Sequence, residues 1–389
     1  MARLGRMRDV MAGYVERGDL PGLVTLVSRR GETHVDALGM KAVGGRDPMR
    51  RDTIFRIASM TKPITAVAAM ILVEECKLRL DEPVDRLLPE LADRRVLTRP
   101  DGPLDDTVPA NRPITLRDLL TLRLGIGVVM AAPGRYPIQK ALDEAGLAAG
   151  PNSPSLAPDE WMACLGRLPL IHQPGETWMY HTGFDILGVL IARAAGQTLE
   201  HFLRERIFAP LGMKDTGLHV PADKLDRLPP SYMADPDTAA LAVHDDPADS
   251  GWARPPAFPS GLVSTVDDYL AFCQMMLHKG RYGRERILSR PSVELMTIDQ
   301  LTPEQKAEAH VFFGDNSGWG FGMSVVTRRD DLSAVPGRFG WNGGVGTSAY
   351  SDPQEDVIGI LMTQRLMDSP DPPRVFRDFW TSAYQAIDD

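Results

Sequence analysis

Strand patterns lie near both ends of this 389-residue chain, and helical patterns fill the middle. Residues 23–28 and 33–38 are short runs rich in apolar and β-branched residues, and an Arg-Gly-Glu turn joins them as in a hairpin. Strand patterns return near the other end, at residues 319–326, 346–351 and 357–362. A sheet that takes strands from both chain ends, with a helical insertion between them, predicts an α+β fold.

The helical patterns divide the chain into two expected domains. Apolar residues recur at helical spacing at residues 63–75, 116–122, 159–165, 186–195, 199–207, 267–277 and 373–386. We expect residues 1–60 and 310–389 to form an α/β sheet domain, and residues 61–309 to form a mainly helical domain with long loops. The frequent Pro and Gly of residues 221–261 predict a long surface excursion.

Composition excludes several classes of function. The chain is 43% apolar, and its net charge of −9 comes without a basic run, which argues against a nucleic-acid partner. No stretch approaches the ~20 apolar residues of a membrane span, and the N-terminus lacks the apolar core of a signal peptide, so we expect a cytoplasmic protein. Cys76, Cys164 and Cys273 form no disulfide or zinc pattern, and we expect them to be buried thiols.

Ser59 and Lys62 are the first candidate catalytic pair. They stand three residues apart at the start of a predicted buried helix, so both lie on one face and the amine can reach the hydroxyl. A serine hydroxyl needs a base to take its proton, and burial in an apolar site favours the neutral lysine amine that can do so. Taken alone, the pattern also fits a helix capped by Ser59 with Lys62 extending to water.

Two further segments carry candidate site residues. Tyr180 lies in a loop before a helix predicted from Phe184, where its phenol can share or relay the proton of Ser59. Taken alone, Tyr180 also fits a core position with a satisfied hydroxyl. The glycines of residues 339–347 let the backbone approach a ligand and present N–H groups to it, although this segment alone is also typical of a β-turn.

In this order, these segments resemble the serine β-lactamase and penicillin-binding (D,D-peptidase) superfamily, in which Ser-x-x-Lys is a signature. The similarity is strongest to class C β-lactamases and family VIII carboxylesterases. It extends over nearly the whole chain, through residues 78–89, 114–125, 175–188, 261–272 and 357–364. The resemblance implies an antiparallel sheet from both chain ends flanked by helices, a mainly helical domain, and an active site between them.

The resemblance also implies roles for single residues. Ser59 would be the acylated nucleophile, Lys62 its general base and Tyr180 the second proton-transfer group. The backbone N–H groups of Ser59 and Gly344 would form the oxyanion hole. No metal and no organic cofactor is required by this chemistry.

Three motifs depart from the usual pattern of the superfamily. The second motif, usually Tyr-x-Asn, has Thr182 in place of the carboxamide that grips an amide side chain. The third, usually Lys-Thr-Gly or His-Thr-Gly, has Trp341 at its first position, so an aromatic wall replaces the cation that pairs with a substrate carboxylate. Residues 122–125 read Leu-Arg-Leu-Gly where His-Thr-Ser-Gly is common. A site without a carboxylate anchor should prefer neutral esters.

We therefore predict a carboxylesterase-type serine hydrolase that cleaves small esters through a Ser59 acyl-enzyme. A β-lactamase, a D-amino-acid peptidase or amidase, and an acyltransferase remain alternatives, because all use the same acyl-enzyme. A penicillin-recognising sensor without activity would need a broken nucleophile, base or tyrosine, and all three are intact. The substrate is thus expected to be a small-molecule ester or lactam.

The substrate pocket and its surroundings complete the prediction. We expect His181 and Asp185 not to form a Ser-His-Asp triad, because Ser-Lys chemistry does not need one, and we expect His181 to face solvent or cap the helix. The loop at residues 259–268 leads into a capped helix and is predicted to be structural. The predicted substrate-binding residues are Trp341, Asn342, Gly343, Thr182, Tyr136, Trp252 and Phe312.

Overall fold

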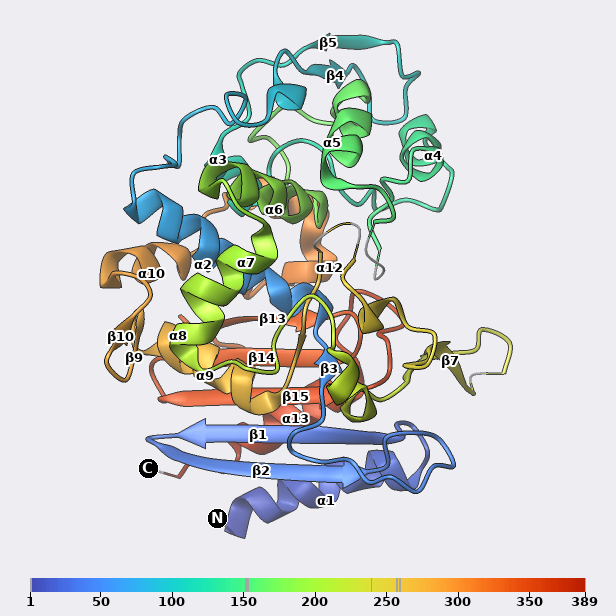
Figure 1. The fold of residues 1–389 in the computed structure, drawn as a ribbon, viewed down its shortest axis with the longest axis vertical. Coiled ribbons are helices and arrows are strands. Elements are labelled where there is room, and N and C mark those ends of the chain that lie inside the picture. The colour runs from blue at the N-terminus through green and yellow to red at the C-terminus, as the bar shows by residue number, and fades with distance from the viewer. Residues whose placement is uncertain (1, 151–153, 239, 257, 259, 389) are drawn as a thin grey trace.

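A seven-stranded antiparallel sheet built from both ends of the chain forms the base of the molecule (Figure 1). The computed structural model describes residues 2–150, 154–238, 240–256, 258 and 260–388. In spatial order the strands are β11 (Ser317–Trp319), β12 (Ser324–Val326), β13 (Phe339–Gly343), β14 (Thr347–Asp352), β15 (Val357–Thr363), β1 (Gly22–Arg29) and β2 (Glu32–Gly39). Strand β1 from one chain end pairs with β15 from the other, with Leu26 opposite Ile360. The predicted α+β fold is confirmed.

Helices cover both faces of this sheet. Helices α1 (Ala2–Glu16) and α13 (Arg374–Tyr384) pack against each other on one face, whereas α9 (Val266–Leu277) packs on β14 and β15. Strand β1 is consequently buried on both sides: Leu23 and Val27 join the layer beneath α1 and α13, and Val24 and Leu26 join the larger core. The N- and C-termini lie close to α1 at the base of the molecule (Figure 1).

Most of the remaining helices lie in the upper half of the molecule in Figure 1, and α8 (Ala209–Leu211) lies lower, beside α9. Helix α2 is apolar on nearly all sides and packs against α6, so it lies within the core, as expected for such a helix. The α-helices other than α1, α9 and α13 are α2 (Thr61–Glu74), α3 (Leu116–Leu120), α4 (Pro137–Glu144), α5 (Pro158–Arg167), α6 (Thr182–Ala195), α7 (Leu199–Leu203), α8 (Ala209–Leu211), α10 (Arg290–Met296), α11 (Pro303–Lys306) and α12 (His310–Phe313). No helix in the described part of the chain is both long and apolar enough to cross a membrane.

Among the described residues, four short strand pairs lie outside the main sheet. They are β3 (Phe55–Arg56) with β8 (Val263–Ser264), β4 (Arg95–Leu97) with β5 (Thr107–Pro109), β6 (Ser231–Ala234) with β7 (Leu241–Asp245), and β9 (Arg281–Tyr282) with β10 (Glu285–Arg286). The β6–β7 pair belongs to the segment 221–261 that is predicted as a surface excursion, and it projects from one side of the molecule (Figure 1).

Several predicted elements differ from the structure. The single strand expected at residues 319–326 is the hairpin β11–β12, because Gly322 adopts φ +80° and turns the chain back. The glycine-rich residues 339–343, expected as a loop before a strand, form β13 itself. The helix expected at residues 199–207 is α7 followed by a π-helical turn, Arg204–Phe208.

The cysteine prediction is correct for one residue of three. Cys273 on α9 is buried, and burial raises the pKa of its thiol to about 12. Cys164 is half-buried and Cys76 is exposed, because Cys76 follows the end of α2 at the surface with φ +58°. Only the thiol on α9 is therefore part of the core.

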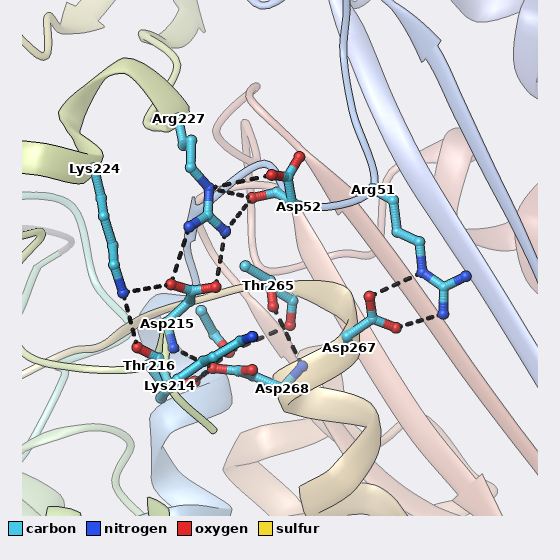
Figure 2. A network of polar contacts seen from close by, with 11 residues as sticks. Arg51, Asp52, Lys214, Asp215, Thr216, Lys224, Arg227, Thr265, Asp267 and Asp268 are labelled. Carbon is cyan, nitrogen blue, oxygen red and sulfur yellow. Dashed lines mark hydrogen bonds and ion pairs between the residues drawn. The ribbon is translucent and has the colours of Figure 1, made fainter. Parts of the chain in front are cut away.

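A polar network on the surface ties the segment after α8 to α9 (Figure 2). Asp215 accepts hydrogen bonds from Lys224 at 2.7 Å and from Arg227 at 2.8 Å. The backbone N–H of Asp215 in turn donates to Asp268 in the first turn of α9 at 2.7 Å. These bonds fix the start of α9, the helix that packs on β14 and β15.

Candidate active site

Ser59 lies in a tight turn, Ala58–Met60, immediately before α2. Ala58 has φ +40°, which a residue with a side chain rarely adopts and which the surrounding structure must enforce. Two long-range hydrogen bonds do so: Ile57 N donates to Leu262 O at 2.9 Å, and Tyr269 Oη donates to Met60 O at 2.9 Å. The position of the Ser59 hydroxyl is thus set by two distant segments.

Lys62 is one helical turn further along and is buried, with 5% of its surface exposed. Its Nζ lies 3.0 Å from Ser59 Oγ, which is hydrogen-bonding distance. The tip of the β11–β12 hairpin closes over this part of α2, because a Cβ built on Gly322 would lie 2.8 Å from Lys62 O. The amine therefore points to the serine. The alternative, in which Ser59 only caps the helix and Lys62 extends to bulk water, does not fit this buried position.

Tyr180 reaches the same place from the segment before α6. Its backbone is fixed by the divergent loop at residues 122–128: Met179 N donates to Leu122 O at 2.8 Å, and Val128 N donates to Tyr180 O at 2.9 Å. Lys62 Nζ lies 4.7 Å from the centre of the Tyr180 ring. The Lys62 amine therefore lies between the Ser59 hydroxyl and the face of the Tyr180 ring, and the catalytic roles of the three residues stay predictions.

Trp341 on β13 adds a contact that the sequence did not indicate. Its Nε1 donates a hydrogen bond of 2.6 Å to Tyr180 Oη. The aromatic wall predicted for Trp341 is also present, since its ring packs edge-on against Trp319 at 4.8 Å, and Tyr180 packs against Phe312 at 5.0 Å. Trp341 thus combines an apolar surface with a polar contact to the phenol.

A cavity of about 950 Å³ opens at this cluster. Of the predicted site residues, the described residues lining the cavity include Ser59, Lys62, Tyr180, Trp252, Phe312, Trp341, Asn342 and Gly344. Thr182, Gly343 and Tyr136 are not among them. Thr182 is buried in the first turn of α6, and Gly343 packs beneath the turn that carries Ser59. Tyr136 is instead the N-cap residue of α4, where its backbone N–H donates to Gln139 and its ring contacts Arg135.

The cavity also contains an acidic group for which the sequence predicted no part in the chemistry. Asp185 is buried on α6, with Oδ2 3.3 Å from His181 Nε2 and Oδ1 accepting from Ser260 Oγ at 2.9 Å. Burial acts to raise the pKa of Asp185, but nearby His181 and Lys62 and the bond from Ser260 outweigh it, and the pKa is lowered. His181 was expected to face solvent or cap the helix; it makes no capping bond and contacts Asp185 instead.

Ser260 and Gly261 are cavity residues that sequence reasoning assigned to a structural loop. Gly261 has φ +76°, and a Cβ there would lie 2.9 Å from the Trp252 ring. A small residue is therefore required next to the aromatic wall. The adjacent Ser-Gly pair was the one signal in the sequence that could have indicated a close approach of backbone to the site.

Comparison with known proteins identifies the family of this chain. The family model described as Beta-lactamase matches residues 7–377. The chain is 39% identical over 368 residues to Protein Rv1367c of Mycobacterium tuberculosis, covering 91% of this chain and 88% of that protein. It is 30% identical over 378 residues to Esterase EstB of Burkholderia gladioli, covering 91% and 88% of the two chains.

A solved structure shares the whole fold. EstCE1, described as a hydrolase with promiscuous acyltransferase activity, is similar with a TM-score of 0.81 at 24% identity, covering 98% of each chain. The fold and site thus define a β-lactamase-like protein, and the chain belongs to the Beta-lactamase family. The resemblance inferred from the motifs is confirmed.

Proposed function

We propose that the protein is a carboxylesterase-type serine hydrolase in which Ser59 forms the acyl-enzyme. The observation that carries this proposal is the 3.0 Å separation of Lys62 Nζ and Ser59 Oγ at the buried end of the cavity. Lys62 removes the serine proton as Oγ attacks the ester carbonyl, and Tyr180 passes a proton to the leaving alcohol. Water then hydrolyses the acyl-enzyme by the reverse sequence of proton transfers.

The backbone N–H groups of Ser59 and Gly344 are proposed to bind the oxyanion of the tetrahedral intermediate. Both residues line the cavity, and the turn containing Ser59 packs against β13, which ends next to Gly344. Donors held by the backbone need no reorganisation as the charge develops, which is what such stabilisation requires. Trp341 and Asn342 would contact the substrate beside them.

Neutral esters are the proposed substrates. The third motif places the indole of Trp341 beside Tyr180, where the family pattern has a cation, and the relative EstB carries the name esterase. A carboxylate on a β-lactam or peptide would find an aromatic surface at this position, and burying an unpaired charge there is costly. Lactam turnover is therefore expected to be slower than ester turnover.

The test compares p-nitrophenyl acetate and butyrate with a chromogenic cephalosporin on the purified protein. Ser59→Ala and Lys62→Ala should each lower ester turnover by at least about 10³-fold, with unchanged thermal melting as the control for folding. Lactam turnover that greatly exceeds ester turnover would refute the esterase assignment. A covalent adduct on Ser59 with a fluorophosphonate, detected by intact mass, separates an enzyme from a simple binding protein.

Acyl transfer to an alcohol is the second candidate. The cavity of about 950 Å³ is at the upper end of the range of about 300–1,000 Å³ for ligand pockets, so it has room for an acyl group together with an acceptor. EstCE1, which shares the fold, is a hydrolase with promiscuous acyltransferase activity. Product analysis in the presence of a primary alcohol distinguishes the two, because transfer yields a new ester and hydrolysis yields the free acid.

A further inference from the structure

One side of the cavity is apolar and closed to solvent. Its lining residues come from α6, from α7 and from the segment before the surface excursion, and they are Phe184, Leu199, Leu203 and Leu218. None of these four residues has more than 7% of its surface exposed. All four also belong to the large hydrophobic core. We call this group of residues the apolar arm of the cavity.

The apolar arm begins beside Ser59 and Lys62. The centre of the Phe184 ring lies 6.0 Å from Lys62 Nζ, which in turn lies 3.0 Å from Ser59 Oγ. Leu199 and Leu203 are four residues apart on α7, so they lie on one face of that helix. Helix α7 packs against both α2 and α6. A group bonded to Ser59 Oγ therefore has an apolar surface within reach.

Polar side chains that line the cavity near the arm already have partners. Thr65 on α2 donates from its Oγ1 to Thr61 O, within the helix, at 3.1 Å. Asp185 on α6 contacts His181 at 3.3 Å and accepts from Ser260 Oγ at 2.9 Å. An apolar chain placed beside these groups breaks none of these bonds, whereas a carboxylate on the chain would lose its water beside the acidic Asp185.

The other side of the cavity is polar and open. Its lining includes Asp331 ahead of β13, Asp371 before α13 and Arg377 on α13, all of which are exposed. When an ester reacts through an acyl-enzyme, the alcohol leaves while the acyl group stays bonded to the serine until water attacks. An open side suits the group that must leave, and a closed apolar side suits the group that stays.

We propose that the apolar arm binds the acyl chain of the ester, and that Leu203 and Leu199 are specificity-determining residues that set the length of chain accepted. This inference rests on the proposed Ser59 acyl-enzyme and narrows its substrates to esters of apolar acids whose chain carries no charge. Leu203 has 0% of its surface exposed, so its side chain has no free solvent to move into. A change of size at this position must therefore change the space in the arm.

The first experiment measures kcat/KM for p-nitrophenyl esters from acetate to decanoate. In the unmodified protein, kcat/KM should rise about fourfold for each added methylene while the chain fills the arm, and fall for longer chains. Leu203→Ala should move the best substrate to a chain longer by about two carbons, because it frees the volume of most of a side chain. Leu203→Phe should lower the ratio of butyrate to acetate turnover at least about tenfold. Leu190→Ala is the matched control, because Leu190 is equally buried on α6 but does not line the cavity.

The second experiment keeps the butyryl group and varies the alcohol from methanol to octanol, with acid release as the readout. Both Leu203 variants should leave the ranking of the alcohols unchanged. A change in alcohol preference without a change in acyl preference would overturn the proposal, because the arm would then hold the alcohol.

An equal loss for all acyl chain lengths, as expected for Leu190→Ala, would also overturn the proposal, since it would show that Leu203 acts only on stability. If Leu203→Ala does not fold, as judged by thermal melting, Leu199→Ala tests the same face of α7, and an unchanged chain-length profile counts against the proposal. Absence of a fluorophosphonate adduct on Ser59 in the unmodified protein would instead refute the proposed function.

Discussion

Tyr180 receives a hydrogen bond from an uncharged donor, the indole N–H of Trp341, at 2.6 Å. An indole nitrogen can donate but cannot accept, so the phenol oxygen must be the acceptor in this contact, and its own proton is free to be directed toward the substrate. The same N–H stabilises negative charge on that oxygen when the proton leaves. At the residue scale, we therefore expect Trp341 to supply a polar contact to Tyr180 without adding a charge to the pocket.

Replacing Trp341 by Phe tests this contact. Removing the N–H leaves the ring surface in place, so kcat for ester hydrolysis should fall about 10–100-fold with little change in KM, the loss expected for a hydrogen bond to a developing charge. Trp319→Phe is the matched control, because Trp319 Nε1 donates to the backbone oxygen of Leu120 and not to Tyr180. Trp341→Phe should have no further effect in a Tyr180→Phe background, and additive losses would contradict the proposed contact.

At the scale of elements, the end of β13 limits which side chains fit beside Ser59. Two adjacent glycines there differ in the space around them. A Cβ on Gly343 would collide with Ile57 O and Thr347 Oγ1, so the strand can pass under the turn that carries Ser59 only with glycine at this position. A Cβ on Gly344 would meet nothing within 4 Å. The close approach of β13 to the turn before α2 is therefore made possible by Gly343.

The pair Gly343→Ala and Gly344→Ala tests this difference. Gly343→Ala should destabilise the fold by about 1–3 kcal/mol, the range for overpacked sites, and should lower esterase activity because the turn carrying Ser59 must move. Gly344→Ala retains the backbone N–H and should change stability by less than about 0.5 kcal/mol. Urea unfolding of both variants provides the measurement, and equal losses would show that the contact with Ile57 does not matter.

At the scale of the whole molecule, the packing is also stabilised by polar contacts among residues that do not line the cavity. The network in Figure 2 joins the segment after α8 to the start of α9, and α9 packs on the sheet that carries Trp341. Its central residue, Asp215, is largely buried under Lys224 and Arg227. Burial alone would raise the pKa of Asp215, but the bonds from Arg227 and Lys224 lower it to about 2.

The lowered pKa of Asp215 predicts a pH-dependent contribution to stability. The ionised form stabilises the fold, so its contribution is complete above the ordinary carboxyl pKa of about 4 and is lost as pH falls toward about 2. Asp215→Asn should cost about 1 kcal/mol at pH 7 after allowance for solvent screening, and less at pH 3. Asp267→Asn breaks an exposed pair with Arg51 and should change little at either pH, as urea unfolding at both pH values would show.

Local patterns in the sequence determined those features of the site that involve residues close together in the chain. The three-residue spacing of Ser59 and Lys62 placed amine and hydroxyl on one helix face, and the structure has them 3.0 Å apart. The loop position of Tyr180 was likewise predicted correctly, and so were the four strands expected at residues 23–28, 33–38, 346–351 and 357–362. These features follow from periodicity and from turn chemistry, which act over a single turn or strand.

The tertiary structure alone decided which distant segments meet. Trp341 and Tyr180 are 161 positions apart, and Ser260 and Asp185 are 75 positions apart, so no local rule relates them. The glycine-rich segment β13 forms a strand because β12 and β14 pair with it, and Tyr136 caps α4 and does not line the cavity. Such contacts depend on how whole layers pack, and packing is a property of the complete chain.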